Sequence, residues 1–318
     1  MAFKVCILTV GCRTNQADSL EIGRAMAAAG MEIVAGPGGA DAVIVNSCAV
    51  TSRAARDVRR LVSGARRAAP GALVIVTVFL VEVEDPSLLR ALGSSREVPC
   101  KDKLAAVGIL EAMAGRAGAA VAAGPRTPGS SRPSLKVQEG CGEACAYCIV
   151  PGTRGPERSV PAAAAIRAAL DLAASGAAEI VLTGTHLGSW GRDLDPPGTL
   201  AGLASAMAAE PGMPRIRLSS IEPWDLGPDL ASAIQGCRPR LCPHLHVPLQ
   251  SGSEAILGSM GRRGGVRAWT DAVSPVAGSV AVGTDVLVGF PGEGDREFGE
   301  TLDLVSSLPI AYLHVFPF

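Results

Sequence analysis

Apolar and polar positions in the first third of the chain alternate between short apolar runs and longer amphipathic stretches. The apolar runs, rich in Val and Ile, cover Lys4–Val10, Ala42–Asn46 and Ala72–Phe79. This composition is typical of strands buried in a parallel sheet. The amphipathic stretches, bounded by capping or breaking residues, cover Asp18–Ala29, Ser52–Ala69 and Lys103–Met113. Alternating strands and helices predict a doubly wound α/β domain over residues 1–118.

The same alternation resumes at residue 134, after a segment without periodicity. Residues 119–133 are rich in Ala, Gly, Ser and Pro and are predicted to form a linker. Strands are predicted at Ser134–Gln138, Glu179–Gly184, Arg215–Ser220, His244–Leu249, Ala281–Val288 and Tyr312–Phe316. Helices are predicted between them at Ala162–Ala174, Leu200–Ala209, Leu226–Gln235 and Arg296–Ser306. Six βα units over residues 134–318 predict a partial parallel (β/α)6 barrel, because eight units usually need about 250 residues.

Composition and charge narrow the class of protein. The 318 residues suffice for two domains with buried cores. The 29 basic and 30 acidic side chains exclude a protein that holds nucleic acid by bulk charge alone. No apolar run reaches the roughly 18 residues of a membrane span, and Met1–Val10 is too short for a signal peptide, so we expect a cytoplasmic protein without a membrane partner. In that reducing compartment, clustered thiols among the nine cysteines bind metal more often than they form disulfides.

The strongest chemical signal is the segment Cys141-Gly-Glu-Ala-Cys145-Ala-Tyr-Cys148, directly after the first predicted barrel strand. Parallel barrels place their chemistry at this end of their strands. Three thiolates leave a four-coordinate structural zinc without its fourth ligand. They can instead hold three irons of a [4Fe–4S] cluster and leave the fourth iron open. The alternatives are a zinc knuckle and three incidental buried thiols.

The residues around this motif resemble the radical S-adenosylmethionine methylthiotransferase family, from about Phe3 to the last residue. The matching segments of the second half are Ser134–Cys141, Tyr147–Pro151, Arg154–Ser159, Val181–Gly188, Arg217–Pro223, His244–Ser253, Asp285–Glu293 and His314–Pro317. Within the family, the phrase Leu-Thr-Gly-x-His-x-Gly at 182–188 resembles the branch that acts on N6-threonylcarbamoyladenosine in tRNA. The isopentenyladenosine branch has a Gly-Gln-Asn phrase there, and the ribosomal-protein branch has a Gln-Asp-Thr phrase.

The resemblance implies a flavodoxin-like first domain, a partial TIM-like radical S-adenosylmethionine barrel, two [4Fe–4S] clusters and S-adenosylmethionine as cofactors. Cys141, Cys145 and Cys148 would hold the first cluster. Reduction of S-adenosylmethionine on its open iron would release a 5′-deoxyadenosyl radical, which is the cofactor's chemistry. The implied reaction is methylthio transfer to C2 of the modified adenosine next to the anticodon. Cofactor-binding residues are predicted at barrel strand ends, at Gly184, Ser219, Ser220, Glu222, Gln250, Ser251 and Asp285. For each polar residue taken alone, a helix cap or a solvated loop is the alternative. His186, His244 and His246 are equally consistent with core histidines and are not assigned as ligands.

The resemblance also implies a second cluster in the first domain, held by cysteines that follow three successive strands. Cys12 and Cys48 occupy two of these positions. The third departs from the family, because Thr77-Val-Phe-Leu-Val-Glu82 stands where the family has Thr-Gly-Cys-Tyr-Ala-Gln, which places Phe79 at the thiolate position. Cys100 is a candidate substitute ligand. The alternatives are a labile or incomplete cluster and a damaged local sequence.

Substrate contacts are predicted in the first domain. Residues 1–130 carry 15 basic and 11 acidic side chains, a net charge of +4, while the remainder has a net charge of −5. Asn15, beside Cys12, and arginines of the predicted helix Ser52–Ala69 are candidate tRNA-binding residues, although a solvated helix face fits the arginines equally well. These arginines are Arg53, Arg56, Arg59 and Arg60.

The implied partners are tRNA, an electron donor such as flavodoxin or ferredoxin, and a sulfur source. Family members usually continue into a small RNA-binding module called TRAM. The chain ends inside or just after the sixth predicted barrel strand, so we expect a fragment truncated at its C-terminus, without TRAM and with a weakened affinity for tRNA. Three other functions stay open: methylthio transfer to isopentenyladenosine or a ribosomal-protein aspartate, an inactive tRNA-binding relic, and S-adenosylmethionine cleavage without sulfur transfer.

Overall fold

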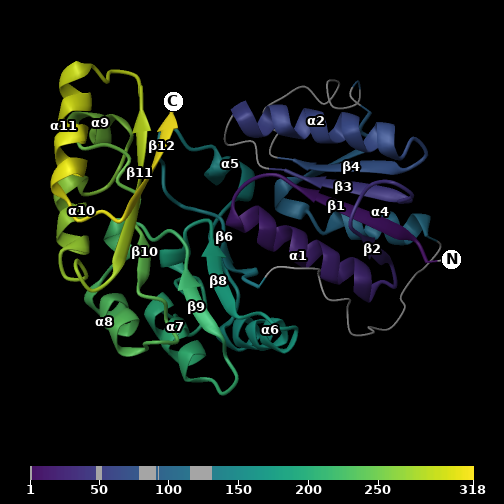
Figure 1. Ribbon diagram of the computed structural model, residues 1–318, viewed down its shortest axis with the longest axis horizontal. Helices are drawn as coiled ribbons and strands as arrows, with labels where there is room; N and C mark the ends of the chain where they lie inside the picture. The colour runs from purple at the N-terminus through teal and green to yellow at the C-terminus, as the bar shows by residue number, and fades with distance from the viewer. Residues whose placement is uncertain (1, 48–51, 79–90, 92, 115–130) are drawn as a thin grey trace. The chain divides into compact units, whose positions relative to one another are not determined.

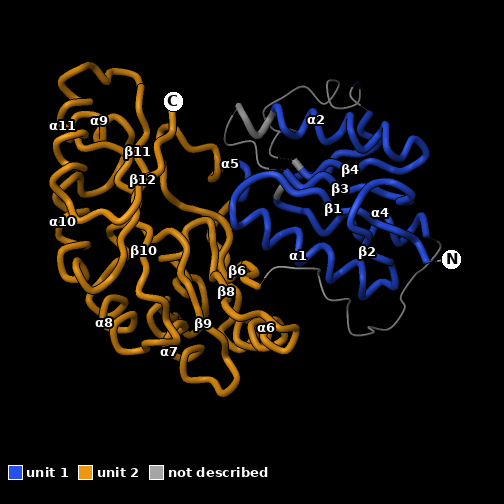
Figure 2. The backbone as a smooth tube through the Cα atoms, in the orientation of Figure 1, with its two compact units in different colours: residues 1–130, 152–154 blue, residues 131–151, 155–318 orange. Residues whose placement is uncertain are grey.

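A computed structural model describes residues 2–47, 52–78, 91, 93–114 and 131–318. It divides the chain into two compact units, residues 1–130 with 152–154 and residues 131–151 with 155–318 (Figure 2). The sequence predicted domains at 1–118 and 134–318. Most of the predicted linker, residues 119–130, lies outside the described residues.

The first unit is built on a parallel sheet of five strands, which run in the order β2-β1-β3-β4-β5. The strands are β1 (Lys4–Thr9), β2 (Glu32–Val34), β3 (Ala42–Asn46), β4 (Leu73–Val78) and β5 (Arg96–Pro99). This order is that of flavodoxin-like folds, in which ligands bind at the carboxyl ends of β1 and β3 where the chain direction across the sheet reverses. The predicted doubly wound class is therefore confirmed.

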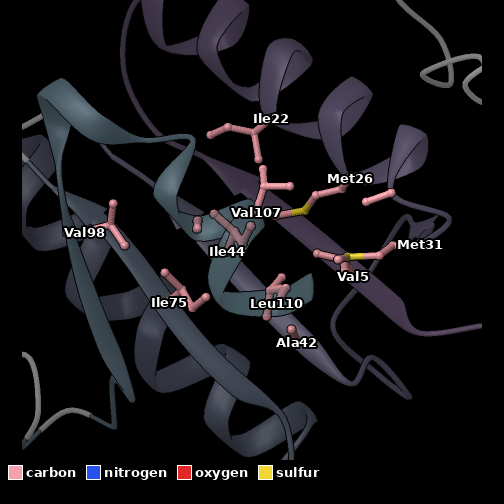
Figure 3. Close-up of a cluster of buried hydrophobic side chains, with 12 residues drawn as sticks. Val5, Ile22, Met26, Met31, Ala42, Ile44, Ile75, Val98, Val107 and Leu110 are labelled. Atoms are coloured by element: carbon pink, nitrogen blue, oxygen red, sulfur yellow. The ribbon is translucent and has the colours of Figure 1, made fainter. Parts of the chain in front are cut away.

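Helices cover both faces of this sheet (Figure 1). They are α1 (Arg13–Ala28), α2 (Ser52–Ala68) and α4 (Ala105–Met113), with a short 3-10 helix, η2, at Cys100–Asp102. Successive residues of β3 point to opposite faces, so Val43 packs toward α2 whereas Ile44 packs toward α1 and α4. Figure 3 shows the α1 and α4 side, where Ile22, Met26 and Leu110 meet Ile44. Fully burying each such side chain contributes about 1.5–3 kcal/mol.

Helix α1 begins earlier than the sequence predicted. The prediction used Asp18 as a capping residue, but the helix starts at Arg13, with Cys12 at its N-cap position. Asp18 lies inside the helix, buried, and forms an ion pair with the buried Lys103. A charged residue with a buried partner was therefore mistaken for a helix start.

The second unit is built on six parallel strands in two sheets, β6-β8-β9 and β10-β11-β12, with β7 antiparallel at the edge. Isolated bridges, Ile216↔Leu241 and Ser220↔His246, join β9 to the segment that contains β10. The strands are β6 (Ser134–Glu139), β7 (Arg158–Ser159), β8 (Glu179–Gly184), β9 (Arg215–Leu218), β10 (His244–His246), β11 (Ala281–Val288) and β12 (Tyr312–Pro317). The predicted partial barrel is confirmed.

Helices follow these strands around the outside of the half-barrel (Figure 1). They are α5 (Val150–Arg154), α6 (Ala162–Ala174), η3 (Leu187–Ser189), α7 (Leu200–Ala209), η4 (Pro223–Asp225), α8 (Pro228–Gly236), α9 (Glu254–Ser259), α10 (Gly265–Val273) and α11 (Asp295–Ser307). Helix α10 was not predicted; its Trp269 is buried and donates a hydrogen bond to the Val247 carbonyl at 2.8 Å. Across the described ranges, no helix is long and apolar enough to span a membrane.

Candidate cluster site and its surroundings

The three-cysteine segment forms a loop between β6 and α5, and backbone hydrogen bonds fix its course. The Cys141 amide donates to the Gly155 carbonyl at 3.2 Å, and the Cys148 amide donates to the Cys145 carbonyl at 3.0 Å. Gly140, which precedes the loop, has a φ of +81°, and a Cβ there would overlap the Pro156 carbonyl. Only glycine fits such a position without strain. The shape of the loop is therefore set by its backbone.

The three thiols of this loop are half-buried and influence one another. Burial raises the pKa of the Cys148 thiol, and the neighbouring Cys145 and Cys141 raise it further. A metal centre relieves this repulsion, because it binds the deprotonated thiolates. Three cysteine thiolates in one loop match the donor set of a [4Fe–4S] cluster with one open iron. The residues present therefore fit such a cluster.

His186, which follows β8, is a buried neighbour of Cys141. Its Nδ1 lies 3.8 Å from Cys141 Sγ and 3.0 Å from Glu157 Oε1, and its Nε2 lies 2.7 Å from Asp225 Oδ2. Burial lowers the pKa of His186, but hydrogen bonds to Asp225 and Cys141 outweigh it and raise that pKa to about 10. Arg192 contacts the other Asp225 oxygen at 2.5 Å. The sequence left His186 unassigned and gave no sign of Asp225.

Gln138, at the end of β6, links the loop to β8. Its amide nitrogen donates to the Gly140 carbonyl at 2.8 Å, and its Oε1 accepts from the His186 amide at 2.8 Å. Gly184 lies against this side chain, since a Cβ there would approach Gln138 Oε1 to 2.8 Å. Gly184 was predicted to bind the cofactor, and in this structure its missing side chain makes room for Gln138.

A polar wall stands beside the loop, formed by residues that follow β9 and β10. Arg262 is buried and donates to Glu222 Oε2 at 2.8 Å and to the Pro248 carbonyl at 2.9 Å. Its guanidinium carbon lies 4.9 Å from the Trp224 ring centroid, a cation–π arrangement. Burial raises the pKa of Tyr147, inside the loop, well above its ordinary value. Of the predicted cofactor-binding residues, Glu222 is the one held in this wall.

Two buried polar atoms near this wall have no hydrogen-bond partner within the part of the chain that the structure describes. They are Thr185 Oγ1, next to His186, and Trp224 Nε1. An unsatisfied buried polar group costs about 1–3 kcal/mol, so such groups often mark a binding position. Both atoms are consistent with a polar ligand beside the cysteine loop, and no sequence pattern singled them out.

The other predicted cofactor-binding residues have different surroundings. Ser251 is fully buried, and its hydroxyl lies 3.2 Å from Thr301 Oγ1, so in this structure it anchors α11. Asp285 contacts two histidines, described below. Gln250 has a φ of +76°, and its amide donates to the Asp285 carbonyl at 2.8 Å. Ser219 is half-buried and Ser220 is exposed, both directly after β9.

In the first unit, a buried polar network underlies the segment after β1. Asn15 is fully buried and donates to the Ser47 carbonyl at 2.9 Å, while Asn46 donates to the Asn15 carbonyl at 2.8 Å. Thr77, on β4, donates to Asn46 Oδ1 at 2.9 Å. The exposed Cys12 lies above it, with its Sγ 3.4 Å from Asn15 Oδ1. Asn15 thus ties helix α1 to the end of β3, and Asn46 extends the network to β4; the role of Asn15 in substrate binding stays a prediction.

The remaining predictions for this unit concern cysteines, Phe79 and arginines. Cys48, Phe79 and the side chains of Arg53 and Cys100 lie outside the described residues. The Cys100 backbone begins η2, directly after β5. On α2, Arg56 and Arg60 are exposed and Arg59 is half-buried. The predicted arginine face therefore consists, among the described side chains, of Arg56 and Arg60.

Comparison with known proteins defines the class. Residues 135–305 match the radical SAM superfamily, and residues 4–96 match the uncharacterized protein family UPF0004. The first match covers more than half of the chain, so the second unit is a radical S-adenosylmethionine domain. In the solved structure of the radical S-adenosylmethionine methyltransferase TsrM from Kitasatospora setae, the same fold recurs, with a TM-score of 0.70 and 14% identity over 100% of this chain and 75% of that one.

Curated relatives narrow the class to a family. The threonylcarbamoyladenosine tRNA methylthiotransferase MtaB of Thermotoga maritima is 33% identical over 99% of this chain and 74% of its own length. Its counterpart from Aquifex aeolicus is 32% identical over 99% and 80%. The tRNA-2-methylthio-N(6)-dimethylallyladenosine synthase of Novosphingobium aromaticivorans is 33% identical over 98% and 74%. The chain belongs to the radical S-adenosylmethionine methylthiotransferase family. It is therefore an enzyme of a family whose chemistry uses a [4Fe–4S] cluster and S-adenosylmethionine.

Proposed function

We propose that the chain is a tRNA methylthiotransferase that transfers a methylthio group to C2 of N6-threonylcarbamoyladenosine next to the anticodon. The observation that carries this proposal is the three-cysteine loop, with His186 3.8 Å from Cys141. His186 belongs to the phrase at 182–188 that resembles this branch of the family. The names of the Thermotoga and Aquifex relatives support the same branch. The isopentenyladenosine branch is the alternative, supported by the Novosphingobium relative at 33% identity.

In this proposal the second unit binds the cofactors and shields them. Cys141, Cys145 and Cys148 hold one [4Fe–4S] cluster, which when bound supplies the electron for cleavage of S-adenosylmethionine. The buried Arg262, paired with the half-buried Glu222, forms a polar wall beside the loop. Such walls orient a bound molecule and keep water from a reactive species.

In this proposal a second cluster in the first unit would supply the sulfur that is transferred, so the ligands available for it matter. Cys12 and Cys48 follow β1 and β3, which are neighbours in the sheet, and position 79 follows β4, the next strand. Cys100 follows β5, three strands away from β1. With about 4.8 Å between adjacent strands, the ends of β1 and β5 lie roughly 14 Å apart. This spacing argues against Cys100 as a substitute ligand, so Cys12 and Cys48 form an incomplete set.

The Phe at position 79 favours a second candidate function, cleavage of S-adenosylmethionine without sulfur transfer. Phenylalanine has no atom that ligates iron, so a second cluster lacks one of its three protein ligands. Substrate recognition is common to both functions. Arg56 and Arg60 are exposed on α2 and are suited to contact tRNA phosphates.

Metal content after anaerobic reconstitution tests the cluster assignment. Two clusters predict about eight irons per chain and one predicts about four, with matching sulfide. About eight irons in the native chain would support methylthio transfer, whereas about four, with little change in Cys12→Ala, would support the second candidate function. In either case Cys141→Ala should lose about four. Phe79→Cys should raise the count toward eight. Iron that survives Cys141→Ala would contradict the assignment.

Mass spectrometry of tRNA nucleosides tests the reaction. The native chain and Phe79→Cys are expressed in a host without the modification, with the host's own reductants and sulfur source. Methylthio gain on threonylcarbamoyladenosine supports the proposal, and gain on isopentenyladenosine identifies the other branch. Release of 5′-deoxyadenosine in vitro with no methylthio gain on either nucleoside in either variant would establish the second candidate function.

A further inference from the structure

Three side chains of the second unit converge on one face of the sheet β10-β11-β12. Asp285 of β11 lies opposite His314 of β12, and His246 of β10 pairs with Gly283, two residues before Asp285. Paired residues of parallel strands, and residues two apart on one strand, share a face. His246, Asp285 and His314 therefore point to the same side of the sheet.

The potential ligand atoms of this triad are close together. His246 Nε2 lies 2.8 Å and His314 Nδ1 lies 3.1 Å from Asp285 Oδ1, and all three atoms lie within 4.8 Å of one another. The exposed fraction of the side chains rises from 8% for His246 through 19% for Asp285 to 56% for His314. The group is thus anchored at one end and open to solvent at the other.

The surroundings orient the buried histidine. Its second ring nitrogen, His246 Nδ1, lies 3.0 Å from the Tyr312 hydroxyl, and the same hydroxyl lies 2.8 Å from His244 Nε2. The Tyr312 ring stacks against His246 with centroids 5.6 Å apart. Metal-binding histidines characteristically hold their second nitrogen in such a hydrogen bond, which fixes the tautomer and the ring orientation.

We propose that His246, Asp285 and His314 bind one divalent transition-metal ion of the Zn²⁺ or Fe²⁺ type, separate from the iron–sulfur chemistry. Two imidazoles and one carboxylate are the protein ligands of many zinc sites and of non-haem iron sites. Both leave coordination positions open, here on the exposed His314 side. Binding replaces the two hydrogen-bond contacts at Asp285 by metal–ligand bonds.

The site has a practical consequence for iron analysis. A mononuclear iron bound here adds about one iron per chain without sulfide, whereas a cubane cluster brings the two in equal numbers. An iron count above four in the native chain therefore does not by itself indicate a second cluster. The iron-to-sulfide ratio separates the two sources.

Cobalt titration of the protein purified without iron tests the proposal. In the protein used for this titration, Cys12, Cys141, Cys145 and Cys148 are replaced by Ser, so that these four thiols do not compete for the metal. We expect about one Co²⁺ per chain, with visible bands that lack sulfur-to-metal charge transfer and disappear when Zn²⁺ is added. Because no cluster is present, the result is independent of whether methylthio transfer occurs.

Four variants in this background assign the ligands. Asp285→Asn preserves the side-chain shape, and His314→Gln lies on the exposed side, so both should fold; each should weaken binding by more than about 100-fold. Tyr312→Phe, which removes only the orienting hydroxyl, should weaken it by about 10-fold. Asp303→Asn, on the exposed face of α11, is the matched control for Asp285→Asn and should bind like the parent.

Thermal unfolding gives a second readout. Excess Zn²⁺ should raise the Tm of the parent and of Asp303→Asn, because a ligand that binds only the folded state stabilises it. It should not raise the Tm of Asp285→Asn. If cobalt bands free of sulfur character are absent, or if Asp285→Asn and His314→Gln bind like the parent, the triad is only a hydrogen-bonded network and the proposal fails.

Discussion

Replacing Asp225 by Asn removes the charge that faces His186 and keeps the shape of the side chain. Asp225 is fully buried and contacts His186 Nε2 at 2.7 Å and Arg192 at 2.5 Å. Breaking a buried ion pair by removing one partner typically costs about 3–5 kcal/mol. The shift of the His186 pKa from 6.5 to about 10 corresponds to about 5 kcal/mol. Part of this shift comes from Cys141, so we expect Asp225→Asn to lower the free energy of unfolding by about 3 kcal/mol at pH 7.

The pH dependence of this loss has a definite sign. The pKa of His186 is raised in the folded state, so its stabilising contribution is complete below about pH 6.5 and is lost as the pH rises toward 10. Across this window the contribution falls by up to about 1.4 kcal/mol per pH unit. Asp225→Asn should lose most of this slope, so its stability curve should approach that of the native chain at high pH.

Urea unfolding of the reduced, iron-free protein, followed by circular dichroism from pH 6.5 to 10, measures both effects. Asp303→Asn, on the exposed face of α11, is the matched control and should follow the native curve. A cost below about 1 kcal/mol at pH 7, or a curve for Asp225→Asn that runs parallel to the native one, would refute the reasoning.

Three further predictions concern the core, the cysteine loop and the arginine face. Trp269→Ala removes the buried ring of α10 and should lower the free energy of unfolding by about 3–5 kcal/mol, measured by urea denaturation. Gly140→Ala places a Cβ against backbone at a φ of +81°, so reconstituted iron should fall well below that of Gly142→Ala, which has open space around it. The double variant Arg56→Glu/Arg60→Glu should weaken tRNA binding and flatten its dependence on salt, measured by filter binding at several salt concentrations.

Controls and contrary outcomes differ among these three. For the core, Arg267→Ala on the exposed side of the same helix should cost less than about 0.5 kcal/mol, and an equal loss in both variants would contradict the packing argument. For the loop, equal iron in the two alanine variants would show that Gly140 does not set its shape. For the arginines, the double variant Arg167→Glu/Arg267→Glu, at exposed positions of α6 and α10, is the charge-matched control, and an equal loss there would indicate a general charge effect.

The sequence predicted the central strands of the first unit because burial on both faces leaves an uninterrupted apolar run. Ala42–Asn46 is buried at every position and was predicted with the bounds that the structure has. The strand β2 has three residues, one of them the exposed Glu32, which is too short for such a pattern. Helix α10 begins at Gly265 after another glycine, and glycines are expected in turns, so its start was hidden.

The candidate site was predictable where its residues are close in sequence. The spacing of Cys141, Cys145 and Cys148 identified the loop because three ligands fall within eight residues. The pair of His186 and Asp225 comes from segments 39 residues apart, and only the fold brings it together. The contact between His246 and His314 was missed for the same reason, because it depends on the register of three strands. A single sequence, read without homologous sequences beside it, carries no signal for such long-range pairs.

The strand order of the first unit has an evolutionary consequence. The segments after β1, β3 and β4 emerge side by side at one edge of the sheet, and position 79 is the first residue after β4. Codons for Phe and Cys differ by a single base, so one point mutation in the gene separates a two-cysteine edge from a three-cysteine edge. Because the strands that define this edge are stabilised by their own buried Val and Ile side chains, such a change alters the ligand set without altering the scaffold.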